Sequence, residues 1–197
     1  MDHTDLTLRP ISGPEEFDLF CRLTYALDHE LAAGRRGPEW MWIAVRGSEL
    51  VARAACWGRA DEPVPLLLDF FDLEDVTVGA RLLRTAMAEI LPAGARPPVY
   101  NRMIPADWRE KAETRSVVED RMIALEQAGA QLLAERPRFE RRPGTPVAPP
   151  RKRLVFRKIR GEDEVLDLMT RVLDGTPDAR SRDDLTRMSA REAAIRH

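Results

Sequence analysis

The sequence predicts an α/β fold of the α+β kind, on three observations. Segments with the two-residue periodicity of strands alternate with segments that have the periodicity of amphipathic helices. The segments 40–46 and 50–57 are separated only by a tight RGSE turn, which is typical of an antiparallel hairpin. Hydrophobic residues make up 44% and charged residues 32% of the 197 residues, the balance of a globular chain.

The opening of the chain predicts a strand followed by a helix. DLTLRPI (5–11) alternates apolar and polar residues, and Ser12 stands three residues before Glu15, the spacing of a capping box. The helix that follows ends at Gly34 and carries its apolar residues on one face: Phe17, Phe20, Cys21, Leu27 and Leu31.

After the hairpin, LLLDFFDL (66–73) is typical of a buried strand. An amphipathic helix follows and ends at Pro92, with apolar positions Leu82, Leu83, Ala86, Met87, Ile90 and Leu91. We then expect a short strand in 97–105, a helix over 114–128 with Gly129 at its C′ position, and an extended segment over 130–142.

The opening stretch LTLRPISGPEEF (6–17) returns as LVFRKIRGEDEV (154–165). Five positions recur in register: Leu6/Leu154, Arg9/Arg157, Ile11/Ile159, Gly13/Gly161 and Glu16/Glu164. A helix is predicted after each copy, and a proline-rich stretch at 143–151 separates them, so the repeat indicates a domain duplication. We expect a first domain at 1–142, a linker at 143–152 and the start of a second copy at 153–197.

The second copy predicts one strand and two helices, too few to build a core equal to the first. We therefore expect residues 153–197 to be an incomplete domain, or a tail that packs on the first domain or on a partner. The chain as a whole is expected to be a truncated product of a tandem protein.

Composition bears on the classes of function. A net charge of −2 argues against nucleic-acid binding, and the arginine-rich stretches 136–142 and 151–160 are interpreted as solvated. No apolar run is long enough for a membrane span, and the N-terminus lacks the pattern of a secretory signal. Cys21 and Cys56 are expected to be reduced, no metal is expected, and the expected compartment is the cytoplasm.

The order of elements resembles the GNAT family of acyl-CoA-dependent N-acetyltransferases. The L-x-L-R-P-I opening, the strand leading into a helix at LLLDFFDLEDVTVGARLL and the late EQAGAQLLAE (126–135) carry this resemblance. It covers residues 5–142 and begins again at 153. It implies a mixed, mostly antiparallel central sheet flanked by helices, acetyl-CoA as cosubstrate, and a small-molecule or peptide amine as acceptor. It also implies a partner surface toward a missing second domain or a homodimer partner.

The resemblance places the pyrophosphate of acetyl-CoA at the turn formed by Thr77, Val78, Gly79 and Ala80. The family pattern there is Arg or Gln, two residues, Gly, any residue, then Gly or Ala. Only Gly79 matches this pattern, and Glu74 and Asp75 put negative charge where phosphates would approach. The alternative is that Gly79 only lets the helix pack closely on a strand.

Asp69 and Asp72 in the buried strand are candidates for the general base that deprotonates the amine, with ordinary polar strand positions as the alternative. The tyrosine that in the family often protonates the thiolate is replaced by Leu125. Trp40, Trp42 and Trp57 line an apolar substrate groove or belong to the core. We expect an acyltransferase-like copy that is weak or silent; the alternative is a non-catalytic module that binds or regulates a partner domain.

Overall fold

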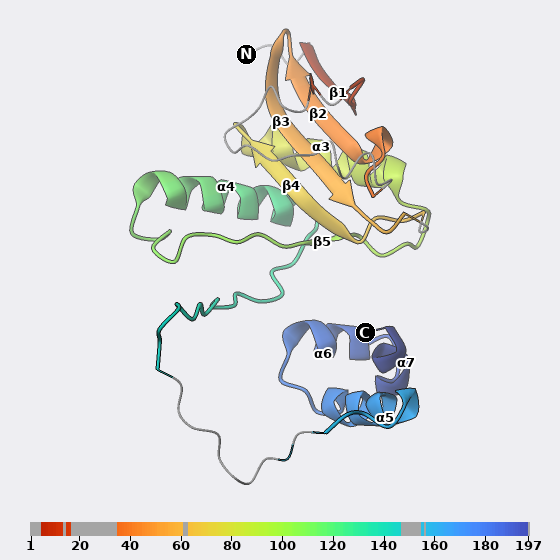
Figure 1. Cartoon of the computed structure of the whole chain (residues 1–197). Helices are drawn as coiled ribbons and strands as arrows, with labels where there is room; N and C mark the ends of the chain where they lie inside the picture. Colours follow the sequence, from red (N-terminus) through yellow and green to blue (C-terminus); the bar gives the residue numbers. More distant parts are fainter. Residues whose placement is uncertain are drawn as a thin grey trace. The chain divides into compact units, whose positions relative to one another are not determined.

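The computed structural model describes residues 5–13, 15–16, 35–60, 63–146, 155 and 157–196 of the chain. The chain divides into two compact units, Met1–Gln131 and Leu132–His197 (Figure 1). The division falls within the segment 130–142, ahead of the proline-rich stretch at 143–151. The residues of 132–142 are exposed and belong to no strand, so they add nothing to the core of the first unit.

The first unit contains a five-stranded sheet in the order β1-β2-β3-β4-β5. Its strands are β1 (Leu6–Pro10), β2 (Met41–Arg46), β3 (Glu49–Trp57), β4 (Leu67–Leu73) and β5 (Val99–Tyr100). Neighbours from β1 to β4 are antiparallel, whereas β5 runs parallel to β4. The mixed, mostly antiparallel sheet and the helices that accompany it confirm the predicted α+β fold class.

The predicted hairpin is formed by β2 and β3. The chain turns at Gly47, whose φ of 61° lies in the left-handed region that glycine enters without steric cost. A single turn of 3₁₀ helix, Pro38–Trp40, leads into β2. The hairpin residues are mostly buried and form the centre of the sheet.

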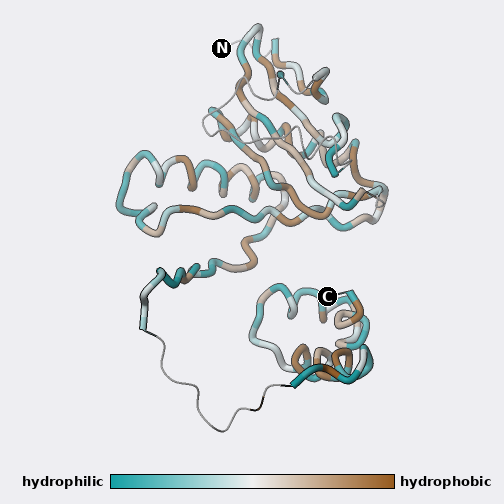
Figure 2. Tube along the Cα trace, in the orientation of Figure 1, coloured by the Kyte–Doolittle hydropathy of each residue, from teal (hydrophilic) through white to brown (hydrophobic). Residues whose placement is uncertain are grey.

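Helix α3 (Val76–Ile90) lies against one face of the sheet (Figure 1). Its apolar positions pack with strand residues that share that face, and brown, hydrophobic stretches run along the strands in Figure 2. The helix contributes Val78, Leu82, Leu83 and Ala86, and the strands contribute Trp42, Ala44, Ala52, Ala54 and Phe71. The alternate strand residues form a second cluster on the opposite face: Ile11, Met41, Ile43, Ala55 and Phe70.

Helix α4 (Ala112–Gln127) packs on α3 and β4. It ends where predicted, with Gly129 at φ 95° beyond its last turn. Its mean hydropathy is low and only Val118 and Ala124 are buried, so much of the helix faces solvent.

The second unit consists of three helices in the described residues: α5 (Glu162–Leu173), α6 (Ala179–Leu185) and α7 (Ala190–Arg196). Leu173, Ala193 and Ala194 form its small core, with Leu166, Met169, Leu185, Met188 and Ala190 around them. None of the helices in the described parts of either unit has the length and apolar character required to cross a lipid bilayer.

Two predicted elements differ from the structure, and a third lies mainly outside the described residues. The strand expected in 97–105 is reduced to Val99–Tyr100, because only these residues pair with β4. The strand expected at 154–159 is not formed at residue 155 or at 157–159, where no neighbouring strand supplies hydrogen bonds. The helix expected between Ser12 and Gly34 falls mainly on 17–34, outside the described residues, and so does Cys21.

Candidate functional site

The edge of β4 is the place where the resemblance locates chemistry. Parallel pairing with β5 is limited to Leu67–Val99 and Leu68–Tyr100, because β5 consists of these two residues only. From Asp69 to Leu73, β4 has no strand partner on that side among the described residues. Both predicted base candidates, Asp69 and Asp72, lie in this stretch.

Asp72 is buried between two arginines. Arg53 of β3 reaches its Oδ2 with Nε at 3.0 Å and with a terminal nitrogen at 2.9 Å. Arg121 of α4 donates to its Oδ1. Burial alone would raise the pKa of Asp72, but the hydrogen bonds from Arg121 and Arg53 outweigh it and hold that pKa below its usual range. An ionised carboxylate with both oxygens occupied is a weak base, so the alternative role, a structural polar position, describes Asp72 better.

Arg121 also binds the edge of β4 that has no strand partner. Its Nε donates to the carbonyl oxygen of Phe71 at 2.8 Å, while its terminal nitrogen binds Asp72. Tyr100 of β5 packs edge-on against Phe71, with ring centroids 6.3 Å apart, and burial raises its pKa. Arg121 therefore lies along the part of the β4 edge that β5 does not pair, and Tyr100 packs beside it on Phe71.

Asp69 belongs to a different ion pair. Its carboxylate accepts two hydrogen bonds from Arg36, one of them at 2.7 Å, and Arg36 stacks over the Phe70 ring at 5.2 Å. Asp69 keeps 24% of its side-chain surface exposed, whereas that of Arg36 is almost fully buried. The Nε of Arg36 has no hydrogen-bond partner among the described residues. The structure thus places Asp69 and Asp72 in separate pairs, on either side of Phe70.

The predicted phosphate turn is occupied by the chain's own groups. The Asp75 side chain caps α3 and accepts from the Val78 N–H at 2.9 Å, and the Gly79 N–H donates to the Asp75 carbonyl at 2.9 Å. Thr77 is exposed, whereas Val78, Gly79 and Ala80 are buried.

Gly79 is needed for close packing of α3 on β4. A Cβ at Gly79 would lie 3.0 Å from Leu73 Cδ2 and 3.2 Å from Phe71 Cζ. Such distances leave no room for a side chain unless its neighbours move. The packing role that the sequence left as the alternative is the one that the geometry supports.

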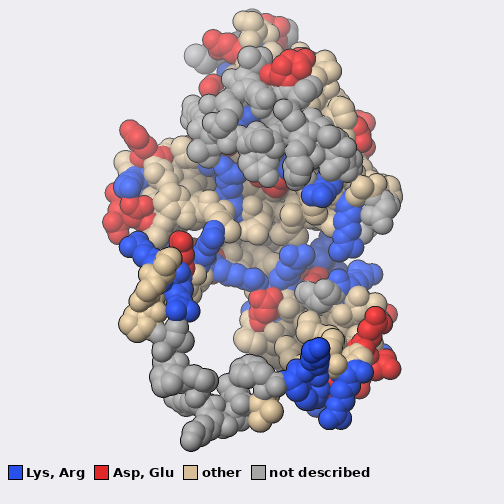
Figure 3. Space-filling model, in the orientation of Figure 1, with Lys and Arg blue, Asp and Glu red and all other residues tan. Residues whose placement is uncertain are grey.

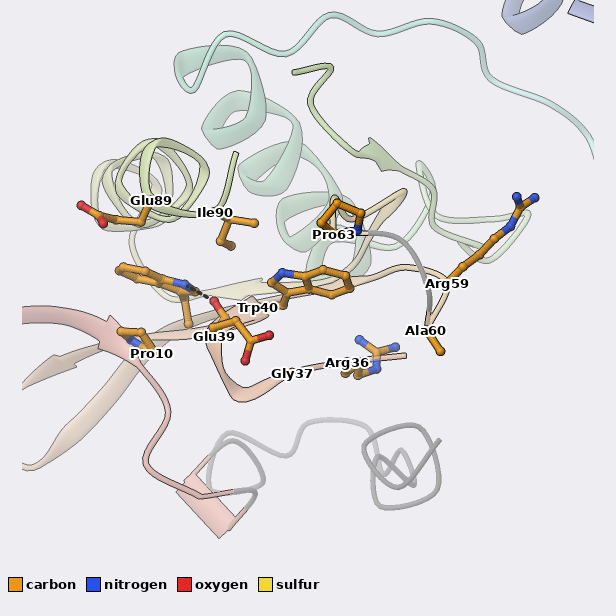
Figure 4. A pocket seen from close by; sticks show the side chains of 11 residues that line it. Pro10, Arg36, Gly37, Glu39, Trp40, Arg59, Ala60, Pro63, Glu89 and Ile90 are labelled. Carbon is orange, nitrogen blue, oxygen red and sulfur yellow. Dashed lines mark hydrogen bonds between the residues drawn. The ribbon is translucent and has the colours of Figure 1, made fainter. Parts of the chain in front are cut away.

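A groove of about 780 Å³ opens at the end of the sheet, next to the Arg36–Asp69 pair (Figure 4). Trp40 stands at its centre, and Glu39, Arg59 and Glu89 bring charge of both signs to its rim (Figure 4). Trp42 also lines it and donates from its indole N–H to the Glu39 carbonyl at 2.9 Å. The two alternatives predicted for the tryptophans, groove and core, apply to different residues. Trp40 and Trp42 line the groove, and Trp42 also belongs to the buried core. Trp57 is not among the lining residues.

Sequence reasoning missed the arginines that hold this region together: Arg36, Arg53 and Arg121. A signal for one of them was present, because Arg53 interrupts the apolar strand LVARAACW as Asp72 interrupts LLLDFFDL. The antiparallel register that places Arg53 opposite Asp72 turns this signal into a pair. Nothing in the pattern of α4 singles out Arg121.

The charged side chains of the described residues do not form a surface patch of a single sign on the face shown in Figure 3. On the face shown in Figure 3, each unit carries basic and acidic side chains. Comparison of the chain with protein-family models, with curated proteins and with solved structures finds no match.

Proposed function

We propose that residues 5–131 form a GNAT-like domain that acts as a non-catalytic binding module, in which acyl transfer from acetyl-CoA is weak or absent. The observation that carries this proposal is Arg121. It bonds the Phe71 carbonyl and the Asp72 carboxylate and so occupies the edge of β4.

An acyl-CoA transferase of this architecture needs three things near that edge: strand backbone donors for the thioester carbonyl, free N–H groups at a helix N-terminus for the pyrophosphate, and a base. Arg121 stands at the strand edge, and the Asp75 carboxylate holds the Val78 N–H. Asp75 and Glu74 also oppose a polyanion by charge. These features support a domain that keeps the architecture without the cofactor site.

The groove at the end of the sheet supports binding as the retained role. The Trp40 ring gives an apolar surface in a hollow whose rim carries Arg59 and two glutamates. A buried guanidinium with a spare Nε donor lies in its wall. We propose that a partner domain or a ligand with both apolar and polar groups binds here.

One observation favours the second candidate, an active N-acyltransferase that uses acetyl-CoA and an amine. The pairing of β4 with β5 ends at Leu68, and Asp69, the next residue of β4, remains partly exposed. In that case Asp69 is the better general base, because Asp72 is enclosed by two arginines.

Titration calorimetry of the full chain with acetyl-CoA tests the proposal, together with turnover on a panel of small amines and peptides. We expect no heat of binding at micromolar concentrations and no turnover. Micromolar binding with turnover that is lost in Asp69→Asn, but kept in the exposed-carboxylate control Glu113→Gln, would establish the second candidate instead.

We also propose a cytoplasmic location for the protein. The support is the Cys56 thiol, which is free and buried, and whose pKa burial raises to about 12. Its state in protein isolated from cells, measured by thiol labelling after denaturation, checks this; a disulfide at Cys56 would contradict it.

A further inference from the structure

The sequence repeat is also a repeat of hydrogen bonds. In the first unit, Arg9 donates to both carboxylate oxygens of Glu16, at 2.9 and 2.6 Å, and the Ser12 N–H donates to Glu16 at 2.6 Å. We call this arrangement the first clamp. Arg9 also donates to the carbonyl of the next residue, Pro10, at 3.0 Å.

The second unit has the same arrangement at the matching positions. Arg157 donates to both oxygens of Glu164, one of them at 3.0 Å, and the Arg160 N–H donates to Glu164 at 2.7 Å. Arg157 donates to the carbonyl of Lys158 at 3.0 Å. This second clamp reproduces the bonds to the glutamate and to the next carbonyl, whereas the bond from Arg9 to the Ser12 hydroxyl at 3.2 Å has no counterpart, because Arg160 stands at that position. The two segments therefore share a local structure and not only a sequence pattern.

In the first unit, the clamp fixes a segment that is covered by a strand. β1 pairs along its whole length with β2, from Leu6–Arg46 to Pro10–Trp42. Ile11 continues this contact through its N–H, which donates to the Met41 carbonyl at 2.9 Å. Its side chain is only 6% exposed and packs with Met41, Ile43 and Phe70.

In the second unit, the matching segment is uncovered. Ile159, the counterpart of Ile11, is 69% exposed, and no strand pairs with it among the described residues. Leu168 and Val172, one turn apart on α5, are 52% and 58% exposed. The buried core of the unit lies elsewhere, around Leu173 and α7, so these three side chains make no part of it.

We propose that residues 157–172 are a docking surface for a β-hairpin of a partner polypeptide. The first strand of that hairpin adds antiparallel to 157–159, as β2 adds to β1, and covers Ile159. We call the three exposed apolar residues Ile159, Leu168 and Val172 the open face. The proposal does not depend on the function of the first unit.

The first unit indicates the chemistry of the partner. The strand beside β1 presents Met41 and Ile43 toward Ile11, so the docking strand carries apolar side chains at alternate positions on its inner side. Main-chain hydrogen bonds supply the pairing, and the apolar side chains supply the preference, as in other cases of strand addition. The second clamp pairs its own charges, so the docking strand needs no charged residue against it.

The test fuses the chain's own hairpin, residues 41–57, after His197 through a flexible linker of about 15 residues, which keeps it at high effective concentration. Amide hydrogen exchange is then measured across 155–160 in the full chain with and without the fusion. We expect at least about tenfold slower exchange in the fusion. A fused hairpin with Ile43→Pro, which cannot pair as a strand, is expected to give no slowing.

Two side-chain variants locate the surface. Ile159→Asp is expected to abolish the slowing, and Leu132→Asp, an equally exposed apolar position outside the open face, is expected to keep it. Circular dichroism checks that both retain the helices. The proposal is overturned if the fusion does not slow exchange, or if Ile159→Asp or the Ile43→Pro hairpin leaves the slowing intact. It is also overturned if the unfused chain shows protection that rises with protein concentration, since the occupant is then a second copy.

Discussion

Residues 6–16 and 154–164 begin alike and end in different surroundings. In both, an arginine donates hydrogen bonds to the carboxylate of a glutamate seven positions later, and the same carboxylate accepts a backbone N–H. The first copy contains an edge strand that pairs with β2, whereas residues 155 and 157–163 of the second copy are exposed and belong to no strand. The clamp is therefore encoded by the segment itself, and the strand is contributed by its neighbour.

The difference follows from the physics of the two structures. The clamp joins residues close in sequence, so little chain entropy is lost when it closes. A strand leaves its N–H and C=O groups unpaired until another strand arrives, and even a two-stranded hairpin is marginally stable alone. Most of the predictions that follow compare an interaction in the first unit with one in the second unit. All four tryptophans, at 40, 42, 57 and 108, lie in the first unit, so their fluorescence reports its unfolding alone.

The largest effect is expected at Asp72, whose ion pair depends on the whole sheet. Asp72→Ala leaves the buried Arg53 without this carboxylate and should destabilise the first unit by about 3–5 kcal/mol. Urea unfolding followed by tryptophan fluorescence measures it. Asp167→Ala, which removes an exposed pair in the second unit, should change stability by less than about 0.5 kcal/mol in circular dichroism.

A double substitution tests whether the loss of stability comes from the unpaired buried charge of Arg53 or from the lost packing of the pair. Replacing both partners with apolar residues, Arg53→Met with Asp72→Leu, should recover most of the loss, because no buried charge remains between them. Equal destabilisation in the single and double variants would show that the pair contributes through geometry and not through charge.

The next effect concerns the packing of helix on sheet. Gly79→Val pushes side-chain atoms into Leu73 and Phe71 and should cost about 1–3 kcal/mol, measured by the same fluorescence unfolding. The control glycine in the second unit is Gly161, where a Cβ would meet nothing within 4 Å. Gly161→Ser should leave stability unchanged or raise it slightly, since serine is a good N-cap residue. A neutral Gly79→Val would remove the packing role assigned to this glycine.

A smaller effect is expected at the repeated isoleucines. Ile11→Val removes one methyl group from a packed cluster and should cost about 0.5–1.5 kcal/mol. Ile159→Val removes the same group from an exposed position and should cost less than about 0.5 kcal/mol. Unfolding curves for both variants of the full chain, read by tryptophan fluorescence for Ile11 and by circular dichroism for Ile159, make the comparison. Similar costs at the two sites would mean that Ile159 is already covered in solution.

The same division explains how much could be predicted from the sequence. The hairpin at Gly47, the end of α3 before Pro92 and the glycine after α4 depend on local chemistry, and all three are found. The strand at 154–159 and the length of β5 depend on partners far along the chain. The first is not formed in the described residues, and the second spans only Val99–Tyr100 of the predicted 97–105. The contact of Arg121 with Asp72 could not be predicted either, because it joins α4 to β4 and depends on how the helix packs.

The last prediction concerns the clamps themselves, where the two copies should behave alike. The hydrogen bond from Arg9 and the Ser12 N–H lower the pKa of Glu16 to about 2, and the hydrogen bond from Arg157 and the Arg160 N–H lower that of Glu164 to about 2. Both pKa values lie below the value near 4.3 of an unfolded glutamate. Each clamp therefore stabilises its segment fully above about pH 4.3, and the contribution is lost as pH falls from there through about 2.

Carbon NMR titration of the two carboxyl groups should give midpoints near 2 for both, and Arg9→Gln or Arg157→Gln should raise the midpoint of its own partner only. Because Glu164 keeps its low pKa without a sheet, equal midpoints would show that the clamp is local; a midpoint near 4 at Glu164 alone would show that the sheet supports the first clamp.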